Sequence, residues 1–146
     1  MADPRNTVTL VGIGYEAETF LIDNSTITYS ATATGGSASV GLAVTFSAAD
    51  TVKLAADGNA IVGKLIKVEA DNKAVVQTGG YVTLPGGNGA SLTRGKKIVG
   101  ALDGSSNPGY IREVATGTAA ELGVARGFIT NAGTTTAVVV RLECAV

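Results

Sequence analysis

The stretch IVGKLIKVEADNKAVVQTGGYVTLPGG, from Ile61 to Gly87, decides the fold of this chain because it carries the pattern of a β-hairpin. Residues 64–69 partly alternate between apolar and charged side chains, which is typical of a strand with two different faces. Asp71 and Asn72 supply a turn, because both tolerate left-handed backbone angles and can hydrogen-bond to their own backbone. Residues 74–78 then predict a returning strand.

The rest of the chain consists of similar short segments separated by glycine. Gly79-Gly80 is expected to end the second strand, and residues 81–84 to form another before Pro85 to Gly89 stops it. Further strands are predicted from β-branched and aromatic content at residues 7–13, 19–22, 26–33, 42–46, 51–54, 96–102, 110–114, 127–130 and 134–143.

One short helix is expected near residue 120. Thr118 and Glu121 have the spacing of a capping box, and Gly123 follows as a stop signal. Many short strands with a single helical turn favour an all-β chain over other fold classes. We therefore predict a single compact β-barrel or β-sandwich of short strands with Gly-rich turns and at most one short helix.

The charge balance argues against two classes of partner. The 146 residues include 11 Lys and Arg against 12 Asp and Glu, a formal net charge of −1, so no basic field predicts a nucleic-acid or membrane partner. No window holds the run of about 18 apolar residues that a membrane span needs. Only 16% of the residues are charged and 45% are hydrophobic, which favours oligomerisation or a large partner surface. The alternative is that small residues inflate the hydrophobic share.

Residues that commonly carry catalysis are scarce. The chain has no His and one Cys, so the usual zinc and copper sites cannot be assembled. Cys144 lacks a His base and is expected to be an inert thiol. Glu16 and Glu18 could share a strand face, but surface carboxylates at this spacing are usually just solvated. We expect a non-enzymatic protein without a cofactor.

Two Gly-rich motifs suggest phosphate binding and fail on inspection. Gly12-Ile13-Gly14-Tyr15-Glu16-Ala17 fits the dinucleotide fingerprint, but Asp23-Asn24-Ser25 turns the chain where a helix is needed, and no acidic residue follows until Asp50. The segment from Gly89 to Lys96 resembles a phosphate-binding loop, but it has one residue too many between its glycines. A turn and a solvent loop are the better interpretations.

A family resemblance rests on three runs in residues 42–143. They are AVTFSAADTVKLAADGNAIVGKLIKVEADNKAVVQTGGYVTLP, then LTRGKKIVGAL, then ARGFITNAGTTTAVVVRLE. The order of a "TVKL" strand, an Asp-Gly turn, a "GKL" hairpin, a "GKKIVG" strand and a terminal Val-rich strand resembles the small capsid cement (decoration) proteins of tailed bacteriophages. Residues 1–41 match this order less well.

The resemblance implies a structural virion protein, made in the host cytoplasm. Such a protein binds the major capsid protein on the outer surface of a mature head, commonly as trimers, and stabilises the head against the pressure of packaged DNA. The expected partners are therefore the capsid subunit and further copies of this chain. The alternative is a phage tail or fibre β-domain, an adhesin that binds a host surface, although aromatic or acidic sugar-binding clusters are lacking.

The N-terminus supplies the candidate capsid-binding residues. We divide the chain into an N-terminal arm, residues 1–9, and a β-rich decoration domain, residues 10–146. Terminal segments that are poor core formers are commonly mobile until they bind a partner, and an arm can add a strand to an exposed sheet edge. The alternative is that the segment from Thr7 to Val11 pairs within the chain's own barrel and leaves only the first few residues loose. The candidate arm residues are Asp3, Pro4, Arg5, Asn6, Thr7, Val8 and Thr9.

Overall fold

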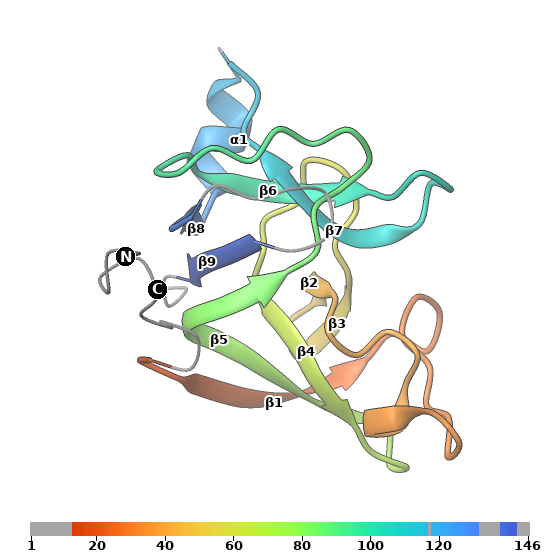
Figure 1. Ribbon diagram of the computed structural model, residues 1–146. Helices are drawn as coiled ribbons and strands as arrows, with labels where there is room; N and C mark the ends of the chain where they lie inside the picture. The colour runs from red at the N-terminus through yellow and green to blue at the C-terminus, as the bar shows by residue number, and fades with distance from the viewer. Residues whose placement is uncertain (1–12, 117, 132–137, 143–146) are drawn as a thin grey trace, which may run out of the picture.

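The computed structural model describes residues 13–116, 118–131 and 138–142 (Figure 1). Strands dominate this part of the chain, and one short α-helix, α1 (Ala119–Val124), and a 3-10 turn, η2 (Thr34–Gly36), accompany them. The predicted all-β class is therefore confirmed. The strands are β1 (Glu16–Ile22), β2 (Ala43–Ala48), β3 (Thr51–Leu54), β4 (Gly63–Val68), β5 (Lys73–Leu84), β6 (Ile98–Leu102), β7 (Pro108–Glu113), β8 (Gly127–Ile129) and β9 (Val138–Leu142).

Five strands close into a barrel in the order β1-β3-β2-β4-β5, because β1 pairs with both β3 and β5. The β1–β3 pairing is parallel and short, whereas the other pairings around the barrel are antiparallel. The predicted hairpin is the β4–β5 unit. Asn72 takes the left-handed conformation in its turn, with φ 62°.

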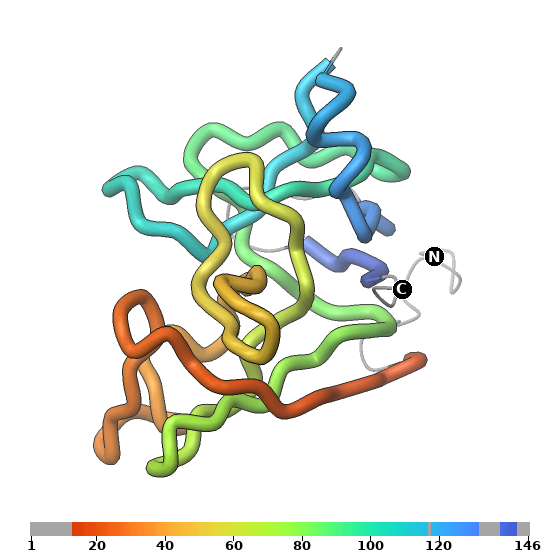
Figure 2. The backbone as a smooth tube through the Cα atoms, turned by 180° about the vertical axis from the view of Figure 1, so that it is seen from behind, coloured from red at the N-terminus to blue at the C-terminus, as the bar shows by residue number. Residues whose placement is uncertain are grey.

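Strand β5 also links the barrel to the rest of the fold. Its first half pairs with β1 and β4, and its second half, from Gly80 to Leu84, pairs with β9, which in turn pairs with β8. Strands β6 and β7 form a separate hairpin. Figures 1 and 2 show this hairpin and α1 at one end of the molecule, with β1 and the β4–β5 turn at the other.

Two hydrophobic cores follow from this arrangement. The first fills the barrel and includes Val44, Val52, Leu65 and Val76. The second lies between the outer half of β5, strands β8 and β9 and the β6–β7 hairpin; its members are Ala43, Ala55, Ile61, Val82, Leu84, Leu92, Ile98, Ile111, Ile129, Val138, Val140 and Leu142. Every second residue of β9 is buried in this core, because successive side chains of a strand point to opposite faces.

The predicted strand at residues 26–33 is wrong. These residues form bends and turns instead. The cause is the carboxylate of Asp23, which accepts hydrogen bonds from the amides of Ser25, Thr26 and Ile27 and thereby uses the donors that a strand ladder would need. Ile27 is nevertheless fully buried, so its hydrophobicity serves the barrel core from a loop.

The predicted break at Gly79-Gly80 is also wrong, since β5 runs through it without interruption. Gly80 has φ 88° and marks the point where the strand changes partners. At α1 the capping box does not form, because Thr118 makes no side-chain cap bond and Glu121 binds Arg112 instead. The helix continues past Gly123, the predicted stop.

Candidate functional surfaces

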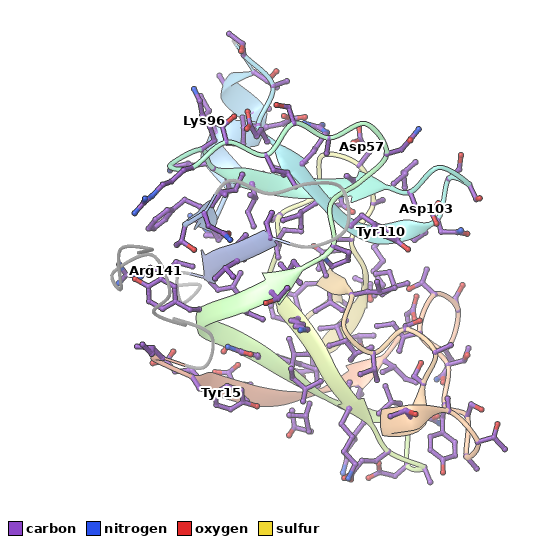
Figure 3. All side chains as sticks on the ribbon, in the orientation of Figure 1. Tyr15, Asp57, Lys96, Asp103, Tyr110 and Arg141 are labelled. Atoms are coloured by element: carbon purple, nitrogen blue, oxygen red, sulfur yellow. The ribbon has the colours of Figure 1, made fainter. Side chains whose placement is uncertain are left out.

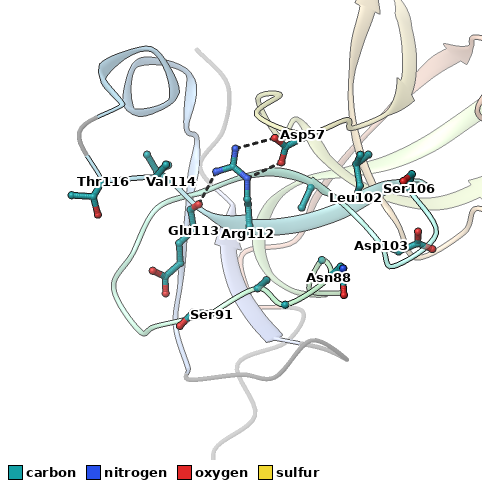
Figure 4. A pocket seen from close by; sticks show the side chains of 15 residues that line it. Asp57, Asn88, Ser91, Leu102, Asp103, Ser106, Arg112, Glu113, Val114 and Thr116 are labelled. Atoms are coloured by element: carbon teal, nitrogen blue, oxygen red, sulfur yellow. Dashed lines mark hydrogen bonds and ion pairs between the residues drawn. The ribbon is translucent and has the colours of Figure 1, made fainter.

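The most highly connected polar cluster surrounds Arg112 on β7. Its guanidinium donates to both carboxylate oxygens of Asp57, at 2.7 and 3.4 Å, and to both of Glu121, at 3.0 and 2.6 Å (Figure 4 shows the Asp57 side). A further bond reaches the Glu113 carbonyl at 3.0 Å. Two bidentate carboxylate partners saturate the donor fork of an arginine. The cluster therefore ties α1 and the Asp57 loop to the β6–β7 hairpin.

The electrostatics of this cluster are fixed by the same bonds. Hydrogen bonds from Arg112, and then from the Ala115 amide, lower the pKa of Glu121 from its ordinary 4.5 to about 2. The carboxylates of Glu121 and Asp57 in turn raise the pKa of Arg112. The carboxylate of Glu121 and the guanidinium of Arg112 therefore stay charged near neutral pH, and neither has the intermediate pKa that general acid or base catalysis requires.

An open cleft of about 740 Å³ lies beside this cluster (Figure 4). Its polar lining includes Asp103, but hydrogen bonds from Asn107, and also from Ser105, hold that carboxylate within its own loop and lower its pKa. Arg112 is occupied by its ion pairs. Within the described residues, no group of three or more potential metal ligands comes together. The charged side chains that line the cleft therefore all bind protein partners; they are Asp57, Asp103, Arg112 and Glu113.

The two Gly-rich motifs are built into other structures. Strand β1 occupies the positions where a dinucleotide fingerprint needs a helix. In the Gly89–Lys96 loop the amide of Gly95 donates to the Ile129 carbonyl at 2.7 Å, and the amide of Thr93 donates to the Glu113 carboxylate. The loop thus directs backbone donors to protein acceptors. Cys144 and the candidate arm residues 3–9 lie outside the described residues.

A second surface lies where β1 meets the bend in β5. Backbone of Gly14 and Gly80 is in close contact, and the amide of Tyr81 donates to the Ile13 carbonyl at 3.0 Å. Ile13 is 53% exposed and Tyr15 is 52% exposed. A hollow here is lined by residues of this seam together with Arg141 and Leu142 of β9. Apolar side chains thus lie exposed beside the start of β1.

Along its first half, the outer edge of β1 is open with respect to the strands that the structure describes. The amides of Leu21 and Asp23 donate toward β3, whereas the amide of Ile22 donates toward the β4–β5 turn. Because hydrogen-bonding groups alternate along a strand, the backbone groups of Ala17 and Thr19 face the β3 side. Strand β3 pairs there with Leu21 and Ile22 alone. Among the described residues, none pairs with the edge at Ala17 and Thr19.

Further apolar side chains are exposed near the other end of β1. Leu21 is 47% exposed, and Phe46 of β2 is 41% exposed. Phe20 and Phe46 form an edge-to-face pair with ring centroids 5.2 Å apart, next to the barrel core. The sequence pattern does not predict this surface, because both rings lie in strands whose neighbours are set only when the barrel closes.

Comparison with known proteins yields no relative for this chain: no family model, no curated protein and no solved structure matches it. Within the part of the chain that the structure describes, no helix is long and apolar enough to cross a membrane.

Proposed function

We propose that this protein decorates a phage head, binding the outer surface of the mature capsid as a structural clamp. The resemblance of three sequence runs to capsid cement proteins supports the proposal, as does the all-β barrel. The observation that carries it is the open edge of β1, bordered by the exposed apolar side chains of Tyr15 and Leu21. Such an edge suits a partner that contributes a strand, through main-chain bonds that need no particular side chain.

The mechanism requires geometry and not catalysis. A protein that binds the mature lattice and not the immature one stabilises the mature lattice by mass action. Several copies acting together on adjacent capsid subunits add avidity without any new type of contact. The closed barrel and its second core supply a rigid body for this purpose, because the paired strands hold the edge of β1 in place.

The test uses purified heads that lack this protein. Mature heads and unexpanded heads are each incubated with the protein and pelleted, and the bound protein is measured. The particles are then heated, and the heads that stay intact are counted by electron microscopy. We expect regular binding to mature heads, weaker binding to unexpanded heads and greater heat resistance of decorated particles. Equal binding to both forms, or binding without a gain in heat resistance, would argue against a clamp.

A substitution at the edge sharpens the test. Thr19→Pro removes an amide that faces the open edge, and proline is tolerated on edge strands. Thr19→Val keeps the amide and serves as the matched control. If a capsid strand adds to this edge, the proline variant binds heads at least about tenfold more weakly, a loss of about 1.4 kcal/mol. The valine variant should bind like the parent protein.

A further inference from the structure

A row of alternating aromatic and cationic residues crosses the sheet beside the β1–β5 seam. In β5, Tyr81 pairs with Arg141 of β9, and Arg141 pairs with Phe128 of β8. Phe128 in turn bridges to Lys97. Neighbouring strands lie about 4.8 Å apart, so these four residues form a line about 14 Å long. We call this line the aromatic–cation row.

The row faces outward. Arg141 and Lys97 are exposed, and Tyr81 and Phe128 are half-buried. On the other face of these strands, as the rule of strand alternation requires, lie buried neighbours of the row. Val82, Ile98, Ile129, Val140 and Leu142 belong to the second core, and Gly127 is buried as well. In Figure 3, Lys96, Arg141 and Tyr15 lie along the same side of the molecule.

The cations of this face have no ion-pair partner among the described residues. The ion pairs among the described residues lie away from the row. They join Lys67 to Glu69, Lys73 to Asp71, and Arg112 to both Asp57 and Glu121. Three more exposed cations lie within three residues of Lys97 or Phe128 in the chain, namely Arg94, Lys96 and Arg126. Five of the 11 Lys and Arg residues therefore belong to the row or to the segments next to it, in a chain of net charge −1.

We propose that the aromatic–cation row docks onto an acidic patch of a partner protein surface. Carboxylates on the partner would pair with Arg141 and Lys97, while the rings of Tyr81 and Phe128 supply apolar contact area between the charges. Arginine and aromatic residues are the types most enriched at the centres of protein interfaces. Cations without an ion-pair partner in the described part of the chain favour a partner patch of the opposite sign.

A single-stranded nucleic acid is the less favoured occupant. Its bases need successive exposed ring faces for stacking. Here the two rings are half-buried, and Arg141 separates them.

This inference rests on the proposed function, with the mature head as the partner. The same hollow contains Ile13 and Gly14, just before β1, together with Tyr81 and Arg141, so the row reaches the β5 side of the start of β1, whereas the open edge of β1 is on its opposite side. A capsid subunit that covers the start of β1 would therefore reach both the row and the edge. The edge would supply main-chain bonds, and the row would supply the charge contacts that fix orientation.

The test compares two double charge reversals. Lys97→Glu with Arg141→Glu inverts the row, and Lys53→Glu with Lys67→Glu changes the net charge by the same amount on β3 and β4 of the barrel. Binding to mature heads is measured at several salt concentrations. Melting curves and sedimentation of each variant establish that it is folded and in the parental oligomeric state. A 20-residue oligothymidylate serves as the nucleic-acid probe.

We expect the row variant to bind heads at least about tenfold more weakly and to lose most of the salt dependence of binding. The barrel variant should stay within about twofold of the parent. Equal head binding by all three proteins overturns the row while leaving the proposed function intact, and failure of the parent to bind heads overturns both. A changed oligomeric state of the row variant would show that the row binds a second copy of this chain and not an acidic partner. Oligothymidylate binding that only the row variant loses would show that the row binds a nucleic acid.

Discussion

Gly80 lies against Gly14 so closely that a Cβ on Gly80 would come within 2.5 Å of the Gly14 carbonyl oxygen. The neighbouring Ile13 carbonyl oxygen lies at the same distance from that position. Both obstacles are backbone atoms, which cannot rotate away as the end of a side chain could. The bend in β5, where the barrel joins the second sheet, therefore depends on a residue without a side chain.

Replacement of Gly80 by Ala should destabilise the protein more than the same change at Gly41. Both glycines have positive φ, 88° and 95°, so both variants carry left-handed strain of about 1–2 kcal/mol. Gly41 has open space around its Cβ position, whereas Gly80 adds a backbone clash of about 1–3 kcal/mol. Urea unfolding of the two variants measures the difference. Equal midpoints would mean that the seam opens freely.

Stability should fall in acid through the Arg112–Glu121 pair. The pKa of Glu121 is lowered from 4.5 to about 2 in the folded protein, so its contribution is full above about pH 4.5 and is lost as the pH falls toward 2. Glu121→Gln should lower the melting temperature at pH 7 and converge with the parent near pH 2. The control Glu69→Gln removes the carboxylate of a solvent-exposed pair and should have a small effect throughout. A constant gap between parent and Glu121→Gln at all pH values would contradict this account.

The β4–β5 turn should tolerate glycine and reject a β-branched residue at Asn72. Its φ of 62° is left-handed, and its amide donates to the Glu69 carbonyl at 3.0 Å. Asn72→Gly should be close to neutral, whereas Asn72→Val should cost about 1–2 kcal/mol of unfolding free energy. A urea melt that gives the two variants the same midpoint would show that the turn does not restrict residue 72 in solution.

Sequence patterns predicted elements whose signals are local. Strand β3 has the predicted bounds, Thr51–Leu54, and the β4–β5 hairpin follows from the turn chemistry of Asn72. The predictions were wrong where a residue with a local sequence signal makes its contacts with residues farther along the chain. Glu121 fits a capping box by spacing, but Arg112, nine residues earlier in the chain, takes its carboxylate. Gly80 has the composition of a strand breaker, yet its conformational freedom lets β5 bend and continue.

The candidate surfaces were harder to predict than the strands. Tyr81, Arg141 and Phe128 become neighbours because β9 is inserted between β5 and β8, and no periodicity within one strand reveals that register. The open edge of β1 likewise exists because β3 pairs only with Leu21 and Ile22, and the sequence does not reveal this register. The predicted arm, residues 1–9, lies outside the described residues and stays a prediction from sequence.

The low share of charged residues predicts self-association. Part of the apolar surface that is exposed in one copy, including Leu122 and Val124 of α1, would be covered in a trimer. Sedimentation equilibrium at micromolar concentration should give three times the mass of one chain. A monomer at this concentration would remove the composition argument, and trimers would then have to be sought on heads alone.

Removal of residues 2–9 tests the candidate arm against its alternative. The segment begins with the poor core formers Asp3 to Asn6 and continues with the strand formers Thr7 to Thr9. An arm that orders only on the head contributes nothing to the folded state of the free protein, so the shortened chain should keep its melting temperature. It should bind heads at least about tenfold more weakly, a loss of about 1.4 kcal/mol, because the main-chain bonds of the added strand are gone. A segment that instead completes the protein's own barrel gives a different result, since its removal exposes a sheet edge and lowers the melting temperature. Equal binding of the shortened and full chains to heads would eliminate the arm as a capsid-binding segment. The Thr19→Pro variant, which blocks the β1 edge itself, would then show whether the head binds that edge in the absence of an arm.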